Sequence, residues 1–326
     1  MINTATCPRC GTENRADAMN CVACRINLKF AQEHPAEIAR IKQEDTKREK
    51  LEGWAFGNAL VGMPASKEES ILLPGLLLLG SFAFAFCLGE AVHELGHFLT
   101  HRAYGFDVQI ILDPFGGSKT LGSSSPREIW GITSAGGPFL NLLVSLVLLL
   151  FLRSKRRPAL LPLLLWGPIA LVQEGVTLSL GMLTPGGDAE LIVDWGVPAA
   201  ILVSLGVLLL ASGVTVICWL LPLVNLSPAD SFSRKFSVVT SGMVSFMVLR
   251  LLCSSLLSPD LASENAVPLI FSLLLATIVV LLYDPLYPIL NRTTRTEPAS
   301  VTWPATVVSI ALGMGMILFQ LVSFRG

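Results

Sequence analysis

Long apolar stretches separated by short polar segments fill most of the chain after residue 71, whereas residues 1–70 are mainly polar. A helix needs roughly 20 mainly apolar residues to cross the hydrocarbon core of a bilayer. The pattern therefore predicts an all-α polytopic membrane bundle of about seven transmembrane helices behind a small polar head. We expect these helices near 71–101, 129–152, 159–183, 197–224, 236–257, 266–288 and 302–323.

The composition agrees with a membrane domain. Hydrophobic residues make up 52% of the chain and charged residues only 14%, and the mean hydropathy is +0.64. Soluble globular domains carry about 25% charged residues. The net charge of −1 gives no reason to expect nucleic acid as a partner, so the lipid bilayer is the first partner that we expect. The opening residues lack a basic segment followed by an apolar core, so no cleaved signal peptide is expected.

The chain is expected to have three parts. A head at 1–30 and a charged linker at 31–70 precede a membrane domain at 71–326. Within that domain, a section at about 71–195 carries the candidate chemistry, and accessory helices follow at 196–326. The linker mixes acidic and basic residues at helical spacings, which predicts a solvated helix that acts as a spacer. A coiled coil that binds a partner is the alternative, but the linker has too few apolar residues for a seam.

Lysine and arginine in the short loops indicate how the bundle is oriented. The loops expected on the N-terminal side of the membrane are richer in these residues than the loops on the other side. Because basic loops stay on the cytosolic side, we expect an integral, multi-pass membrane protein with a cytosolic N-terminal head. The basic residues of these inner loops are Arg153, Lys155, Arg156, Arg157, Arg234, Lys235, Arg292 and Arg295.

Four cysteines of the head form two Cys-x-x-Cys pairs, Cys7 with Cys10 and Cys21 with Cys24. Two such pairs supply the four soft ligands of a closed tetrahedral zinc site. Both pairs, with the Gly-Thr-Glu-Asn that follows the first, resemble the zinc-ribbon family, which implies a structural Zn²⁺ that folds the head or docks a protein partner. Two disulfides in an oxidising compartment are the alternative. The other cysteines lie in the expected spans as small packing residues: Cys87, Cys218 and Cys253.

The first expected span carries the sequence His-Glu-Leu-Gly-His at positions 93–97. Residues four apart project from one face of a helix, so His93 and His97 can bind one metal ion. Glu94 lies beside them, where a carboxylate can remove a proton from a water molecule that zinc activates. Ionisable side chains at this depth are costly unless they face the bundle interior. Glu90 and His101 extend the same polar stripe, and for each we expect a supporting or helix-end role.

A catalytic zinc usually has three protein ligands and a water molecule, so a third ligand is needed. Asp188 is the first candidate because it follows Pro-Gly-Gly, which ends the third span and leaves the backbone pliable. An aspartate at this place can instead be the N-cap of the next helix. Glu174, within the third span, is the alternative ligand, since a carboxylate inside a membrane is a functional candidate by default. In an up-down-up bundle, the end of the first span, the start of the second and the end of the third share one membrane face, which favours Asp188.

These residues resemble the site-2 protease family of intramembrane zinc metalloproteases, over the range from Glu90 to about Leu191. The first matching element is the histidine motif at 91–97 with His101. The segment Ser134–Asn141 is similar to the family's Ala-Gly-Pro-x-x-Asn element. Leu183–Asp188 is similar to the family's motif that supplies the third ligand. The resemblance implies a three-helix core in which His93, His97 and Asp188 hold a catalytic Zn²⁺. It also implies Glu94 as the general base and Asn141 as a substrate or helix-packing contact.

The activity that the resemblance implies is hydrolysis of a peptide bond in or near a membrane helix of another protein. That substrate helix must first unwind locally. The segment from Phe106 to Leu121 alternates apolar and polar residues around a Pro-Phe-Gly-Gly turn, and we expect an edge hairpin that captures substrate by strand addition. Two other functions stay open. One is a catalytically silent membrane scaffold of the same fold, against which the intact Glu94 argues. The other is a membrane metalloprotease of different architecture with Glu174 as third ligand. Transport is less favoured, because no inverted repeat is visible.

Overall fold

The computed structural model describes residues 4–8, 12–15, 18–21, 27–41, 43–44, 71–114, 118–122, 126–183, 187–257, 262–294 and 299–323. By its internal contacts the chain forms two compact units, Met1–Ala65 and Ser66–Gly326. The boundary between them falls inside the expected linker.

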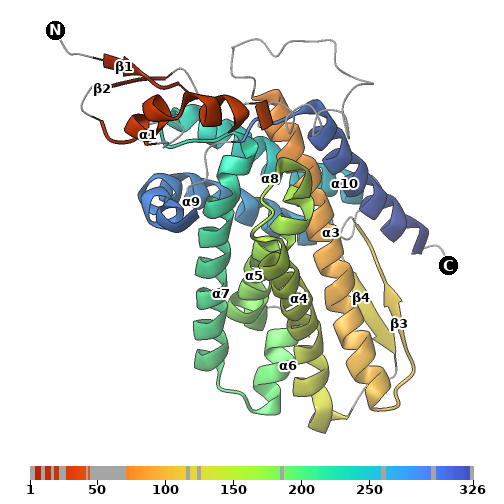
Figure 1. The fold of residues 1–326 in the computed structure, drawn as a ribbon. Helices are drawn as coiled ribbons and strands as arrows, with labels where there is room; N and C mark the ends of the chain where they lie inside the picture. The colour runs from red at the N-terminus through yellow and green to blue at the C-terminus, as the bar shows by residue number, and fades with distance from the viewer. Residues whose placement is uncertain are drawn as a thin grey trace. The chain divides into compact units, whose positions relative to one another are not determined.

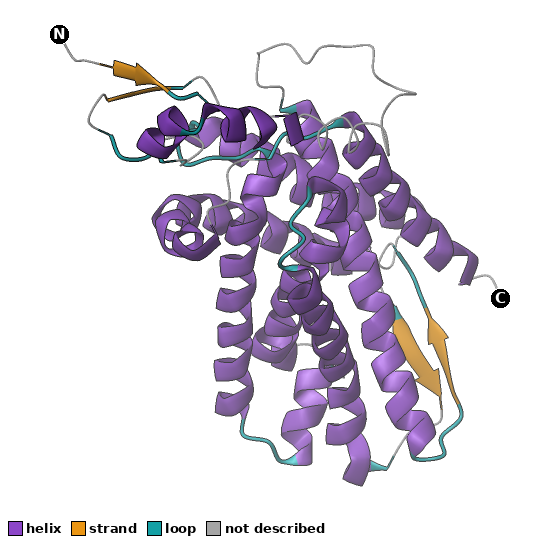
Figure 2. Ribbon diagram, in the orientation of Figure 1, coloured by secondary structure: helices purple, strands orange, loops and turns teal. Residues whose placement is uncertain are grey.

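The N-terminal unit begins with a short hairpin, in which β1 (Thr4–Thr6) pairs antiparallel with β2 (Glu13–Arg15), as Figure 2 shows. Helix α1 (Leu28–Glu33) follows. The side chain of Asn27 caps this helix by accepting a hydrogen bond from the amide of Phe30 at 3.0 Å. Such a cap satisfies one of the backbone N–H groups that a helix leaves unpaired at its start.

Two of the four head cysteines lie in the described part of the chain. Cys7 and Cys21 are buried and belong to one small apolar cluster with Leu28. Cys10 and Cys24 lie outside the described residues. The four-cysteine zinc site therefore stays a prediction.

The first part of the linker is helical at residues 35–41 and 43–44. Arg40 Nε lies 3.8 Å from Glu44 Oε1, one turn further along, and both side chains are about 70% exposed. Opposite charges at this spacing on an exposed helix are typical of a solvated spacer. Residues 45–70 of the expected linker lie outside the described residues.

Seven helices of the second unit are long and apolar enough to cross a membrane, counted over the described residues. This confirms the expected multi-pass membrane protein, and the helix bounds lie within several residues of those predicted. Because most residues of these helices are apolar, the helices can face both lipid and neighbouring helices, while their backbone polar groups are paired within each helix. The helices are α3 (Leu72–Ala103), α4 (Trp130–Leu152), α5 (Leu161–Leu180), α7 (Ala199–Leu220), α8 (Phe232–Leu257), α9 (Ala262–Thr294) and α10 (Trp303–Ser323).

Helix α3 is central in this unit and packs against α4, α5, α8 and α10 (Figure 1). Its contact with α10 includes hydrogen bonds between the helices. Ser309 Oγ lies 2.8 Å from Ser81 Oγ and donates to the carbonyl of Leu77 at 2.9 Å. Gln320 Nε2 donates to the carbonyl of Cys87 at 2.8 Å. Because lipid removes the hydrophobic drive for helix association, such bonds and close packing hold the helix that carries the histidine motif in place.

A short helix, α6 (Asp188–Trp195), connects α5 to α7. It lies at the end of the bundle where α3 ends and α4 begins (Figure 1). Trp195 Nε1 donates a hydrogen bond to the carbonyl of Glu128 at 2.8 Å, immediately before α4. Packing of α6 on α4 thus fixes the position of Asp188, the first residue of α6.

After α3 the chain forms a two-stranded antiparallel hairpin of β3 (Val108–Ile111) and β4 (Lys119–Gly122). Val108 pairs with Gly122, and Ile111 pairs with Lys119. The hairpin lies beside α3 (Figures 1 and 2). The hairpin predicted from the alternating pattern is therefore confirmed, whereas strand addition by a substrate stays a prediction.

Candidate metal centre

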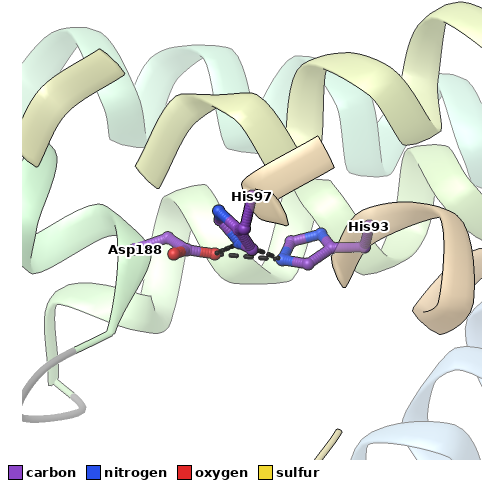
Figure 3. Close-up of side chains that lie close together, drawn as sticks. All are labelled: His93, His97 and Asp188. Atoms are coloured by element: carbon purple, nitrogen blue, oxygen red, sulfur yellow. Dashed lines mark hydrogen bonds and ion pairs between the residues drawn. The ribbon is translucent and has the colours of Figure 1, made fainter. Parts of the chain in front are cut away.

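Three ligand-type side chains converge at the end of the membrane unit where α6 lies (Figure 3). His93 and His97 come from one face of α3, and Asp188 begins α6. His93 Nε2 lies 3.0 Å from His97 Nε2. Asp188 Oδ2 lies 3.1 Å from His93 Nε2 and 3.3 Å from His97 Nε2.

These separations match the edges of a zinc coordination tetrahedron. Zinc bonds to nitrogen and oxygen of roughly 2.0–2.1 Å place neighbouring donor atoms about 3.3 Å apart at the tetrahedral angle. The three observed separations are 3.0, 3.1 and 3.3 Å. Two imidazoles and one carboxylate also form a donor set that zinc accepts, with a fourth position left for water. The residues present therefore fit a zinc ion.

The backbone around Asp188 explains why its carboxylate reaches the histidines. Gly187, with extended backbone at φ −74° and ψ 157°, is the N-cap of α6, and Asp188 is the first helical residue. The alternative interpretation of Asp188 as the N-cap of this helix is therefore wrong. Its carboxylate oxygen Oδ2 faces Nε2 of both histidines instead.

The Asp188 carboxyl group is largely buried, which by itself would raise its pKa. When His93 and His97 are protonated, their hydrogen bonds to this carboxylate and their positive charge outweigh burial and lower the pKa of Asp188 well below its ordinary value. The carboxylate is thus held in the ionised form that a metal ligand needs.

The other ring nitrogen of His93 is held by a relay of hydrogen bonds that crosses three helices. Trp166 Nε1, which can only donate, bonds to Asn141 Oδ1 at 3.0 Å. The amide of Asn141 then donates through Nδ2 to Glu174 Oε1 at 2.7 Å. His93 Nδ1 lies 3.0 Å from the same oxygen, which accepts a hydrogen bond from its N–H. In the neutral ring, with its proton on Nδ1, His93 therefore presents the lone pair of Nε2 to the centre.

His97 is oriented in the same sense by a different partner. Its Nδ1 lies 2.7 Å from the carbonyl oxygen of Thr133 on α4, and a carbonyl oxygen can only accept. The proton therefore sits on Nδ1, and Nε2 presents a lone pair to the centre. A Cβ atom at Gly137 would lie 2.4 Å from His97 Nε2, so this close approach of α4 to α3 requires glycine.

Glu94 points toward the hairpin. Its side chain is buried, and its Oε2 accepts a hydrogen bond from Thr120 Oγ1 of β4 at 2.9 Å. The same hydroxyl lies 3.1 Å from the Glu94 carbonyl oxygen. The hairpin thus restrains the carboxylate of Glu94, which lines the same cavity as His93 and Asp188.

The remaining predicted residues surround the centre without joining the group of three. Glu174 contacts Nδ1 of His93, on the far side of the ring from Asp188. Asn141 is buried in the relay. Glu90 Oε1 pairs with Arg250 Nη2 of α8 at 2.8 Å. His101, near the end of α3, makes an edge contact with Phe106 at 6.2 Å between ring centroids.

Sequence reasoning missed Trp166, Thr133 and Thr120 as parts of the site. Trp166 and Glu174 are eight residues apart, so they share a face of α5, and this spacing is a signal that was available in the sequence. The carbonyl of Thr133 and the hydroxyl of Thr120 act through tertiary contacts between α3, α4 and the hairpin. No local pattern marks either residue.

A cavity of about 730 Å³ borders the centre and is lined by His93, Glu94, Glu174 and Asp188, among other residues. Its size lies within the range of small-molecule binding pockets, ~300–1,000 Å³. It gives the candidate metal centre a space in which a reactant can lie.

Comparison of the chain with known protein families, with curated proteins and with solved structures finds no match. The geometry of the centre and the membrane-spanning helices are therefore the basis for a functional conclusion.

Proposed function

We propose that this chain is an intramembrane zinc endopeptidase that hydrolyses a peptide bond of a transmembrane protein. The observation that carries the proposal is the convergence of His93 Nε2, His97 Nε2 and Asp188 Oδ2 at separations of 3.0–3.3 Å within a multi-pass membrane unit. The resemblance of the sequence around these residues to site-2 proteases supports the same conclusion.

Bound zinc would supply a Lewis acid that lowers the pKa of a water molecule toward ~7 and polarises a carbonyl group. Glu94 is the proposed general base. Its carboxylate takes one proton from the attacking water, whose oxygen bonds to the peptide carbonyl carbon. The C–N bond then breaks, and Glu94 returns the proton to the leaving nitrogen. One water is consumed, and a carboxylic acid and an amine are formed.

The other side chains keep these groups in position. Glu174, fixed by Asn141 and Trp166, holds the ring of His93, and the Thr133 carbonyl holds the ring of His97. Thr120 restrains Glu94. Asn141 thus has a positioning role in the proposal, and the hairpin is the expected site of strand addition by an unwound substrate.

The proposal gives the head a separate, structural Zn²⁺ held by Cys7, Cys10, Cys21 and Cys24. Such a closed site has no open coordination position. It would fold the head or dock a cytosolic protein partner, and it would take no part in hydrolysis.

The decisive test combines metal content with cleavage of a panel of co-expressed, single-span membrane proteins. We expect two zinc ions per chain in the wild type and cleavage of at least one panel member. Glu94→Gln should keep both zinc ions and lose cleavage by about a hundredfold or more, whereas Glu128→Gln, at an exposed carboxylate, is the matched control. Full cleavage by Glu94→Gln would overturn the assignment of the base.

A further inference from the structure

The cavity beside the metal centre is elongated and follows two helices. On α3 it is lined from Phe82 to His93 at helical spacings of three and four residues, and on α5 from Ile169 to Leu180 in the same way. Each of these runs covers 12 residues and thus 11 steps, so the cavity extends about 17 Å along both helices at 1.5 Å per residue. The cavity is therefore an elongated channel that extends away from the candidate metal centre.

The two ends of this channel differ. Phe82, Ile169 and Met247 line it, and all three are 2% exposed, so they form a buried apolar end. His93 and Asp188 line the opposite end, as does Leu180, which is 50% exposed. A molecule that enters at the candidate metal centre would therefore extend toward the buried end.

Several polar side chains interrupt the apolar wall between the two ends, including Glu90, Gln173 and Glu174. Glu90 Oε2 and Glu174 Oε2 are buried without a hydrogen-bond partner among the described residues. Gln173 Oε1 is buried and has no hydrogen-bond partner among the described residues. A Cβ atom at Gly89, on the facing side of α3, would lie 2.6 Å from this oxygen. A buried acceptor without a donor is unfavourable, so the channel is suited to an occupant that brings an N–H group to Gln173.

We infer that this channel is the subsite that holds an extended, apolar segment of the substrate polypeptide on one side of the scissile bond. At about 3.3 Å per residue, a channel of about 17 Å takes about five residues. Gln173 Oε1 accepts a backbone N–H of that segment, and the apolar walls select large aliphatic or aromatic side chains. An acyl chain would also fill apolar space, but it has no donor for Gln173. The inference rests on the proposed metal centre.

Hydroxamates test the inference without a known substrate, because a hydroxamate group binds zinc. We suggest two matched series, oligoleucine hydroxamates of one to six residues and linear alkyl hydroxamates of equal length, with acetohydroxamate as the shortest probe. Dissociation constants are measured for the full chain in lipid nanodiscs. We expect the Kd of the peptide series to fall by about threefold or more with each added leucine, up to about five residues, and then to level off.

Three variants and one control locate the effect. Ile169→Trp fills the buried end and should weaken the pentaleucine hydroxamate at least about tenfold while acetohydroxamate binds as in the wild type. Val172→Phe gives a second test, three residues nearer the candidate metal centre. Leu208→Trp, at a side chain of α7 that is 65% exposed, is the matched control and should change neither. Gln173→Leu should weaken the peptide series by about fivefold to tenfold and leave the alkyl series unchanged.

The outcomes separate this inference from the proposed function. If the wild type does not bind acetohydroxamate, the metal centre itself fails. If acetohydroxamate binds but affinity does not rise with peptide length, the metal centre stands and the inference is wrong. A steeper gain with alkyl than with peptide hydroxamates, insensitive to Gln173→Leu, would make the channel an acyl-chain site and overturn the inference.

Discussion

Polar side chains occur within the spans both in the first part of the membrane unit, α3–α6, and in the second, α7–α10, but they are arranged differently. In the second part, Lys235 Nζ donates to both carboxylate oxygens of Asp284 at 2.6 and 2.8 Å and to the Pro228 carbonyl at 3.0 Å. Three donors thus meet three acceptors. Tyr283 likewise donates to the carbonyl of Leu226 at 2.7 Å.

In the first part, by contrast, lone pairs converge. Both histidines donate a hydrogen bond from Nδ1, His93 to Glu174 and His97 to the Thr133 carbonyl. Their Nε2 atoms face Asp188. Buried lone pairs that face one another are unfavourable unless a cation lies between them. A closed polar cluster therefore holds helices together, whereas a convergent set of acceptors indicates a binding site.

The largest effect is expected from Asp188→Asn, which removes the anionic ligand. Zinc affinity of the membrane unit should fall by more than about a hundredfold, because a direct ligand contributes more than the 10–100-fold of a supporting partner. The measurement is zinc content per full chain against a series of chelators. Asp194→Asn, on the exposed side of α6, is the control and should bind as the wild type; equal binding by Asp188→Asn would contradict the assignment.

The next effect is expected from Glu174→Gln, which keeps the shape of the relay and removes its charge. We predict a loss of zinc affinity of about 10–100-fold, since His93 loses the carboxylate that fixes its ring. The same chelator series measures it. If Glu174→Gln abolishes binding while Asp188→Asn retains it, Glu174 is the third ligand and the alternative architecture is correct.

A smaller effect is expected from Thr120→Val, which removes the hydrogen bond to Glu94. The loss of one such bond, about 1 kcal/mol, corresponds to about a fivefold lower rate of cleavage. Zinc content should stay unchanged, and Thr120→Ser should restore the rate. A loss of zinc in Thr120→Val would show that the hairpin supports the ligands and not the base.

The smallest effect on the metal centre is expected from Lys235→Met in the second part of the unit. Zinc affinity should stay within about twofold of the wild type, because the closed cluster serves packing alone. The free energy of unfolding should fall by about 1–2 kcal/mol, less than for a fully buried pair, since the Asp284 side chain is 52% exposed and water screens its charge. Thermal unfolding in detergent measures this change. A parallel loss of zinc would contradict a role of the Lys235 cluster in packing alone.

Much of the fold could be predicted because it follows from local pattern. Apolar length gave the seven spans, and alternation around Pro-Phe-Gly-Gly gave the hairpin. The i, i+4 spacing placed His93 and His97 on one face, and the break before Asp188 placed a carboxylate at the right membrane face.

The rest depends on how the helices are rotated and packed against one another. Glu174 was a plausible ligand in the sequence, and only the packing of α5 on α3 decides that it meets Nδ1 of His93. The role of Trp166 needs the side chain of Asn141 between two helices. The channel is lined by α8 and α9 as well as the core, and sequence distance gives no hint of that contact.

The central claim is that His93, His97 and Asp188 hold zinc, and its most direct test is a structure of the zinc-loaded full chain with anomalous scattering recorded at the zinc edge. We predict a zinc peak at roughly 2.0–2.2 Å from the Nε2 atoms of both histidines and from an Asp188 oxygen. A peak bound to Glu174, or zinc confined to the N-terminal cysteines, would contradict the account.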